Sequence, residues 1–132
     1  MIIDTSALIA AITAESSADG LREILSRDGG RISAATLVEA RIVAYGKGGP
    51  AVGRRLESVL RWAGTEIVPF DAAQADAAAD AYRDYGRGSG HPARLNLGDT
   101  FSYALASIRD EPLLYVGDEF GHTDIRSALG ER

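Results

Sequence analysis

Four carboxylates in this sequence stand where they could act as one chemical group: Asp4, Glu39, Asp99 and Asp118. Asp4 and Asp118 each come after a short apolar run of the kind that forms buried strands. Carboxylates that converge repel one another, and bound cations would neutralise them. Because no histidine accompanies these acids, the group suits Mg2+ or Mn2+, which take further ligands from water and phosphate oxygens.

Each of these acids also fits an ordinary structural role. Asp is a preferred N-cap residue, so Asp4 could simply begin the helix that follows it. Glu39 stands three residues after Thr36, which is the spacing of a capping box. Asp99 follows Asn96 by the same spacing, at a helix start where a negative charge is favourable. The hypothesis of a shared site rests on repetition, because parallel connections bring strand ends and helix starts to one side of a sheet.

The elements that must position these acids alternate along the chain. Strands are expected at 1–3, 31–33, 66–70 and 112–116. Helices are expected at 7–12, 21–25, 36–45, 52–60, 71–85 and 97–108. A glycine-rich turn at 46–50 separates two of the helices. This alternation predicts an α/β protein, a three-layer α/β/α sandwich around a parallel sheet.

Composition limits the remaining possibilities. A chain of 132 residues with 45% hydrophobic content is expected to fold as a single domain over residues 1–132. The absence of cysteine excludes disulfides and thiolate metal sites. No apolar run approaches the roughly 20 residues of a membrane span, so a cytoplasmic protein with no membrane partner is expected. The net charge of -5 argues against a broad nucleic-acid-binding surface, although a local basic patch remains possible.

Several stretches resemble the PIN domain and, more narrowly, the VapC toxin ribonucleases of VapBC toxin–antitoxin pairs. They are residues 2–8, the Glu39 helix after Ser33, residues 95–106 and residues 117–125. The resemblance covers the whole chain and is most specific at Asn-Leu-Gly-Asp, within residues 95–106. It implies a five-stranded parallel sheet, Mg2+- or Mn2+-dependent cleavage of RNA, a homodimer, and a VapB-like antitoxin that blocks the site.

The resemblance also implies roles for individual residues. Three acids fall on acidic positions of the family: Asp4, Glu39 and Asp99. Asp118 is predicted as the fourth, with Glu119 as the alternative, because family members often carry Asn-Asp or Glu-Asp directly before the phenylalanine. Supporting contacts to these acids or to phosphate are expected from Thr5, Ser6 and Thr123.

A basic, glycine-rich loop at 87–94 is the best candidate for RNA contact. An acidic protein needs local cations to hold phosphates, and this loop directly precedes the segment that carries Asp99. Arg87 and Arg94 are therefore predicted to contact the RNA.

The predicted chemistry is attack by a metal-activated water. In that reaction the 2′-hydroxyl takes no part, so the products end in a 5′-phosphate and a 3′-hydroxyl. A metal-independent ribonuclease would need two histidines as general acid and base, and His91 and His122 are the only pair in the chain.

Two other classes of protein share part of this pattern. Phosphatases of the haloacid dehalogenase type also begin with a strand that ends in Asp, but they need a second Asp where Ser6 stands. They also need a catalytic lysine, and the glycine turn around Lys47 is a poor place for one. A catalytically inactive PIN-like metal-binding interaction module is the non-enzymatic alternative; the intact acids argue against it.

Overall fold

The computed structural model describes residues 1–130 of the chain. Four strands form its sheet: β1 (Ile2–Ile3), β2 (Arg31–Ser33), β3 (Glu66–Val68) and β4 (Leu113–Leu114). Around the sheet lie α1 (Thr5–Ile12), α2 (Ala18–Arg27), α3 (Ala34–Ala63), α4 (Ala72–Tyr85), α5 (Leu97–Arg109) and the 3-10 helix η1 (Phe120–His122). All strands are parallel, in the order β3-β2-β1-β4. The α/β class with a parallel sheet is thus confirmed.

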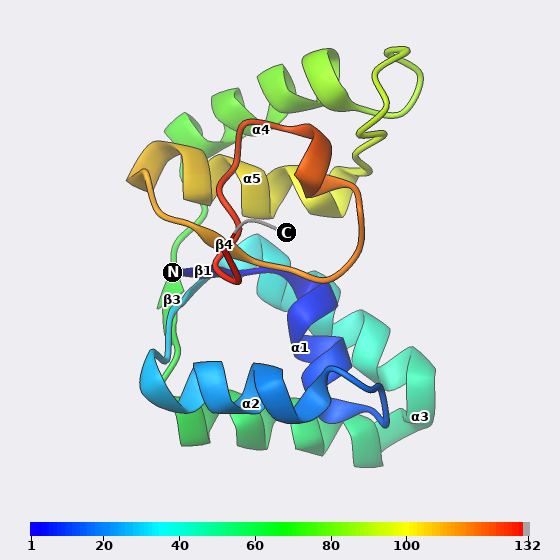
Figure 1. Cartoon of the computed structure of the whole chain (residues 1–132), viewed down its shortest axis with the longest axis vertical. Coiled ribbons are helices and arrows are strands. Elements are labelled where there is room, and N and C mark those ends of the chain that lie inside the picture. Colours follow the sequence, from blue (N-terminus) through cyan, green and yellow to red (C-terminus); the bar gives the residue numbers. More distant parts are fainter. Residues whose placement is uncertain (131–132) are drawn as a thin grey trace.

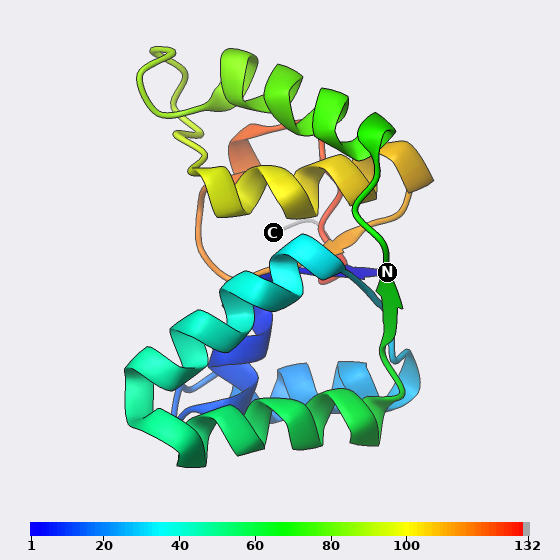
Figure 2. The same cartoon turned by 180° about the vertical axis from the view of Figure 1, so that it is seen from behind.

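Helices cover both faces of the sheet. α1, α2 and α3 pack together on one side, while α4 and α5 lie on the other (Figures 1 and 2). Each side has its own apolar cluster, the first around Leu8, Leu25 and Leu56, the second around Leu95 and Leu105. The predicted three-layer arrangement is confirmed. Among residues 1–130, none of the helices has both the length and the apolar character needed to span a membrane.

The predicted fifth strand is reduced to one bridge. Ser127 pairs in parallel with Leu113, on the free side of β4. The backbone N–H of Leu113 donates to the carbonyl of Arg126 at 2.9 Å, and that of Ala128 donates to the carbonyl of Leu113 at 2.8 Å. The predicted strands at 66–70 and 112–116 are also shorter than expected. Pro69 has no N–H to extend the first of them, so it ends at Val68.

α3 contains the glycine turn that the sequence predicts between two helices. Its backbone leaves helical geometry at Gly48 and Gly49, directly before Pro50. Gly49 has a φ of 64°, a left-handed conformation that glycine adopts readily. Figure 2 shows the two halves of α3 running in different directions from this point, the first leading away from the sheet and the second returning toward β3.

α3 also begins earlier than predicted, and this removes one structural explanation for Glu39. Ser33 is both the last residue of β2 and the N-cap of α3, and its Oγ accepts from the N–H of Ala35 at 3.2 Å. Thr36 is a buried residue inside the helix instead of its cap. The predicted capping box between Thr36 and Glu39 is therefore wrong. The corresponding box at Asn96 and Asp99 is present at the start of α5.

The segment after η1 is attached to α5 by one hydrogen bond. The hydroxyl of Tyr103 donates to Oδ1 of Asp124 at 2.6 Å. Burial, followed by this hydrogen bond to Asp124, raises the pKa of Tyr103, so the phenol remains a donor at neutral pH.

We expect Tyr103→Phe to lower the free energy of unfolding by about 1.5 kcal/mol, because the variant cannot form this hydrogen bond to a charged acceptor. Tyr45→Phe is the matched control, since Tyr45 is 63% exposed. Urea unfolding of both variants measures the difference. Equal stability of the two variants would show that the bond to Asp124 contributes nothing.

Candidate active site

Three of the predicted acids line one pocket of about 320 Å3. Asp4 lies between β1 and α1, Glu39 lies on α3, and Asp99 lies in the first turn of α5. These elements are far apart in sequence, and the parallel sheet brings them together as predicted. Thr5 and Ser6 line the same pocket.

Asp4 is the most buried of the three, with 2% of its surface exposed. Its Oδ1 accepts from Ser102 Oγ at 2.6 Å, and its Oδ2 accepts from the N–H of Ser6 at 3.0 Å and from Ser6 Oγ at 2.6 Å. Burial raises the pKa of Asp4, and the hydrogen bonds from the two serines oppose that rise. Asp4 is thus both the N-cap of α1 and part of the wall of the acidic pocket.

Ser102 is a site residue that the sequence reasoning missed. It is fully buried on α5, and its Oγ also shares a hydrogen bond of 3.2 Å with Oγ1 of Thr36. Its position three residues after Asp99 placed it on the same side of a predicted helix, and a serine among apolar neighbours was the available signal. Its partner Asp4 is 98 residues away, so the contact was beyond local pattern reasoning.

Glu39 is held between α1 and α5. Its Oε1 accepts from Thr5 Oγ1 at 2.5 Å. Its Oε2 would be 1.6 Å from a Cβ at Gly98, so a larger residue at position 98 would displace this carboxylate from its present position. Burial raises the pKa of Glu39, the hydrogen bond from Thr5 lowers it, and the charge of Asp4 raises it further.

Asp99 has the most perturbed carboxyl group of the pocket. Burial raises its pKa to about 7, and the backbone N–H of Asn96, which donates to Oδ2 at 3.0 Å, opposes the rise. The charges of Asp4, Glu119 and Glu39 raise the pKa further. At neutral pH without a cation, this carboxyl group therefore holds a proton about half of the time.

The fourth acidic position differs from the other three in its geometry. Neither Asp118 nor Glu119 lines the pocket of the other three acids, although the charge of Glu119 raises the pKa of Asp99. Asp118 as the fourth acid, with Glu119 as the alternative, therefore stays a prediction. Thr123 lies outside the acidic pocket; its Oγ1 donates to the carbonyl of Phe120 at 2.8 Å and accepts from the N–H of Ile125 at 3.2 Å.

The donor set of the pocket consists of oxygen atoms, which suits a hard cation. Within residues 1–130, no three His, Asp or Glu side chains stand close enough together to hold a metal ion as they are. Thr5 and the two serines bind the carboxylates in its place. Metal binding would require these side chains to turn toward one another.

The predicted basic loop lies beside this acidic group. Arg87 and Arg94 line a second pocket of about 310 Å3, which Asp118, Glu119 and His122 also line. The base of the loop is closed by two backbone hydrogen bonds, from the N–H of Arg87 to the carbonyl of Leu95 and from the N–H of Leu95 to the carbonyl of Tyr85, both at 2.9 Å. The two arginines therefore lie on a loop whose base is held by hydrogen bonds.

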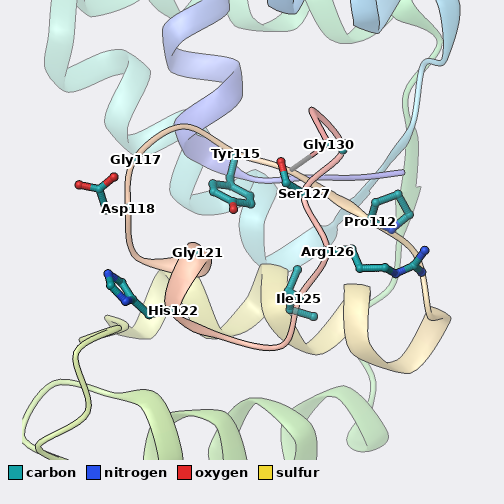
Figure 3. Close-up of a pocket in the computed structure, with 11 residues that line it drawn as sticks. Pro112, Tyr115, Gly117, Asp118, Gly121, His122, Ile125, Arg126, Ser127 and Gly130 are labelled. Atoms are coloured by element: carbon teal, nitrogen blue, oxygen red, sulfur yellow. The ribbon is translucent and has the colours of Figure 1, made fainter. Parts of the chain in front are cut away.

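A larger pocket, of about 900 Å3, lies between η1 and the segment around Ser127. Figure 3 shows Asp118 and His122 on one side of it and Pro112 and Arg126 on the other. Asp118 and His122 also line the pocket of the basic loop, so they form the boundary between the two cavities. His91 is not paired with His122 for acid–base chemistry; its Nδ1 accepts from the N–H of Ala93 at 3.1 Å within the loop.

Lys47 is a second residue that the sequence reasoning missed. It lines the acidic pocket together with Glu39, from the last turn of α3 before the glycine turn. Because Lys47 lies in a glycine-rich turn, the sequence suggested that it was poorly placed to act as a catalytic lysine. The signal was the spacing of Glu39, Val43 and Lys47, which is i, i+4, i+8 along one helix face.

Comparison with known proteins identifies the family of this chain. The PIN domain family matches residues 1–126. Ribonuclease VapC42 from Mycobacterium tuberculosis is 52% identical over 129 residues, which cover 97% of this chain and 98% of the relative. Ribonuclease VapC28 from the same species is 45% identical over 133 residues, with 100% of both chains covered.

Two solved structures share the fold. The crystal structure of Mycobacterium tuberculosis VapC20, described as a sarcin–ricin loop cleaving toxin, matches with a TM-score of 0.74 at 12% identity, covering 94% of this chain and 95% of that one. A toxin–antitoxin complex from Klebsiella pneumoniae matches with a TM-score of 0.66 at 19% identity, covering 90% and 88%. These two likenesses concern the fold alone. From the family match over residues 1–126 and the relatives at 45% and 52% identity, the chain belongs to the PIN-domain family and, within it, to the VapC ribonucleases.

Proposed function

We propose that this protein is a metal-dependent endoribonuclease and the toxin of a type II toxin–antitoxin pair. The observation that carries the proposal is the meeting of Asp4, Glu39 and Asp99 in one pocket, where the pKa of each carboxyl group is raised. A cluster of this kind is costly without a counter-charge, and a divalent cation supplies one. The alternative of a dehalogenase-type phosphatase lacks support, because the family match is to the PIN domain.

The residues that would hold Mg2+ or Mn2+ are Asp4, Glu39 and Asp99, with Glu119 or Asp118 as the fourth. When bound, the metal supplies an activated water and stabilises charge on the phosphate and the leaving oxygen. Ser6 and Ser102 hydrogen-bond the Asp4 carboxylate on both of its oxygens, while Thr5 hydrogen-bonds one oxygen of Glu39. Asp99 loses its residual proton when the site is filled, because a nearby cation favours the charged form.

The proposed substrate is single-stranded or looped RNA. The related fold of VapC20 belongs to a toxin that cleaves the sarcin–ricin loop, which is consistent with an RNA substrate here. Arg87 and Arg94 form no ion pair with the described residues, so their guanidinium groups remain available for phosphates.

The proposed protein partners are a VapB-like antitoxin and a second copy of the chain. α3 exposes three apolar side chains at i, i+4, i+7 spacing, and solvent-exposed apolar stripes of this kind often mark protein interfaces. They are Val38, Ile42 and Tyr45, which are 56%, 68% and 63% exposed. Since Glu39 lies on the same half of α3, a partner bound there would also lie close to the acidic pocket.

Purified protein is expected to cleave RNA with Mg2+ or Mn2+ and to stop in EDTA. The products should carry 5′-phosphate and 3′-hydroxyl ends, because a metal-activated water is the nucleophile. Labelling of the ends before and after phosphatase treatment identifies them. Cyclic 2′,3′-phosphates, or cleavage that continues in EDTA, would mean that the 2′-hydroxyl attacks and that the metal proposal is wrong. Protein that binds Mg2+ without any cleavage would instead support the inactive interaction module.

Asp99→Asn is expected to abolish cleavage and the Mg2+-dependent rise in melting temperature together. That rise reflects binding to the folded state only. The pKa of Asp99 is about 7 in the fold against an ordinary value of 3.8, so the folded state binds more protons than the unfolded state between these pH values. The parent's stability should therefore fall as the pH rises from about 4 to about 7, and this slope should shrink in the variant.

The measurement is a set of thermal melts across pH, each with and without Mg2+. Asp76→Asn, which removes an exposed carboxylate on α4, is the matched control and should behave like the parent. If Asp99 served only as a capping residue, its replacement would cost roughly 0.3 to 1 kcal/mol in the metal-free protein and leave the Mg2+ response intact. That pattern would contradict a metal-binding role.

Replacing Arg87 and Arg94 together by Ala is expected to weaken RNA binding and to reduce the salt dependence. For a single strand, each phosphate that the protein no longer neutralises makes the slope of log affinity against log salt shallower by about 0.7. Replacing Arg54 and Arg55 by Ala is the matched control, because both are exposed on the far half of α3. Equal slopes for the two double variants would make the 87–94 loop a simple connection.

A further inference from the structure

We infer that Lys47 is a phosphate-binding residue at the rim of the acidic pocket and that it holds the RNA backbone beside the cleaved bond. The inference rests on the proposed ribonuclease function and adds to it a contact with the substrate. Lys47 is the single lysine of the chain, whose other basic side chains are arginines and histidines.

The position of Lys47 is set by the first half of α3. Glu39, Val43 and Lys47 follow one another at intervals of four residues, and all three line the acidic pocket. Eight residues correspond to about 12 Å along a helix axis. The backbone of Lys47 therefore lies about two turns along the helix from that of Glu39.

The ammonium group of Lys47 has no carboxylate partner among residues 1–130. No ion pair within 4.0 Å and no side-chain hydrogen bond joins it to the described residues, although Glu15 and three predicted metal-binding acids line the same pocket. Arg41, by contrast, is paired with Glu57 at 2.7 Å. Lys47 thus remains available for a ligand.

A lysine at this position would favour binding of the RNA substrate. An RNA strand that enters this pocket carries phosphates toward several carboxylates, and phosphates next to the cleaved one would be repelled by them. A lysine at the rim offsets that repulsion, and its flexible stem allows it to follow the phosphate. The glycine turn at Gly48 and Gly49 interrupts α3 directly after Lys47, which is exposed at the point where the helix changes direction.

The test compares Lys47→Met with Lys47→Arg and with the control Arg55→Met in steady-state RNA cleavage at saturating Mg2+. Lys47→Met should raise KM for RNA by about three- to tenfold, as expected when one exposed charged group is removed from a binding site. Lys47→Arg should restore most of the affinity, and Arg55→Met should match the parent. The Mg2+ concentration for half-maximal activity and the melting temperature should be unchanged in all three.

A second readout does not depend on cleavage. Reductive 13C-methylation keeps the charge of lysine and gives one side-chain dimethyl-lysine signal in this chain, separate from that of the terminal amine. In EDTA, a short single-stranded RNA of mixed sequence should shift that signal, and inorganic phosphate should shift it less.

The outcomes separate the inference from the proposed function. A parent that cleaves RNA, together with an unchanged KM in Lys47→Met and an unshifted methyl signal, overturns the role of Lys47 and leaves the ribonuclease intact. A changed Mg2+ requirement with an unchanged KM also overturns it, because Lys47 would then be a counter-ion of the acids. A parent that never cleaves RNA removes the proposed function, and the methyl signal alone then decides whether Lys47 meets the RNA backbone.

Discussion

The burial of the Asp4 carboxylate is the constraint on which the rest of this structure depends. A charged group with 2% exposure needs donors on every side, and Ser6 and Ser102 supply them from two different helices. Ser6 Oγ in turn accepts from the backbone N–H of Val116 at 3.0 Å, just beyond β4. One carboxylate thereby links the start of α1 and the middle of α5 to the sheet, and the other acids lie around it.

At this pocket, the clustering of acids that the proposed function needs lowers the stability of the fold. Burial and neighbouring charges raise the pKa of the carboxyl groups of Glu39 and Asp99, so bringing these acids together has an electrostatic cost. Burial of the two apolar clusters on the two faces of the sheet stabilises the fold and offsets this cost. Gly98 belongs to the same compromise, since its missing side chain gives Glu39 its space at the expense of helix propensity.

Local sequence patterns predicted the helices and their caps well, because both depend on residues that are close together in the chain. The helix expected at 71–85 and the capping box at Asn96 are present where they were expected, the helix from Ala72. Predictions failed where contacts between residues far apart in the sequence determine the structure. Thr36 had the right spacing to Glu39, yet the chain enters α3 three residues earlier, and Thr36 turns inward to Ser102. Likewise, nothing in the sequence of Asp118 and Glu119 shows which of the two adjacent carboxylates acts on the pKa of Asp99.

The direct passage from β2 into α3 has a consequence for how this family can vary in length. Ser33 ends the strand and caps the helix, so no loop residue separates the sheet from Glu39. One residue inserted between Ser33 and Glu39 would rotate the glutamate by about 100° around the helix axis and turn it out of the pocket. The spacing of these residues is therefore fixed by helical phase, whereas the 87–94 loop, closed at its base, can gain or lose residues without turning any acid. Insertions and deletions among related chains should gather in that loop and avoid the junction.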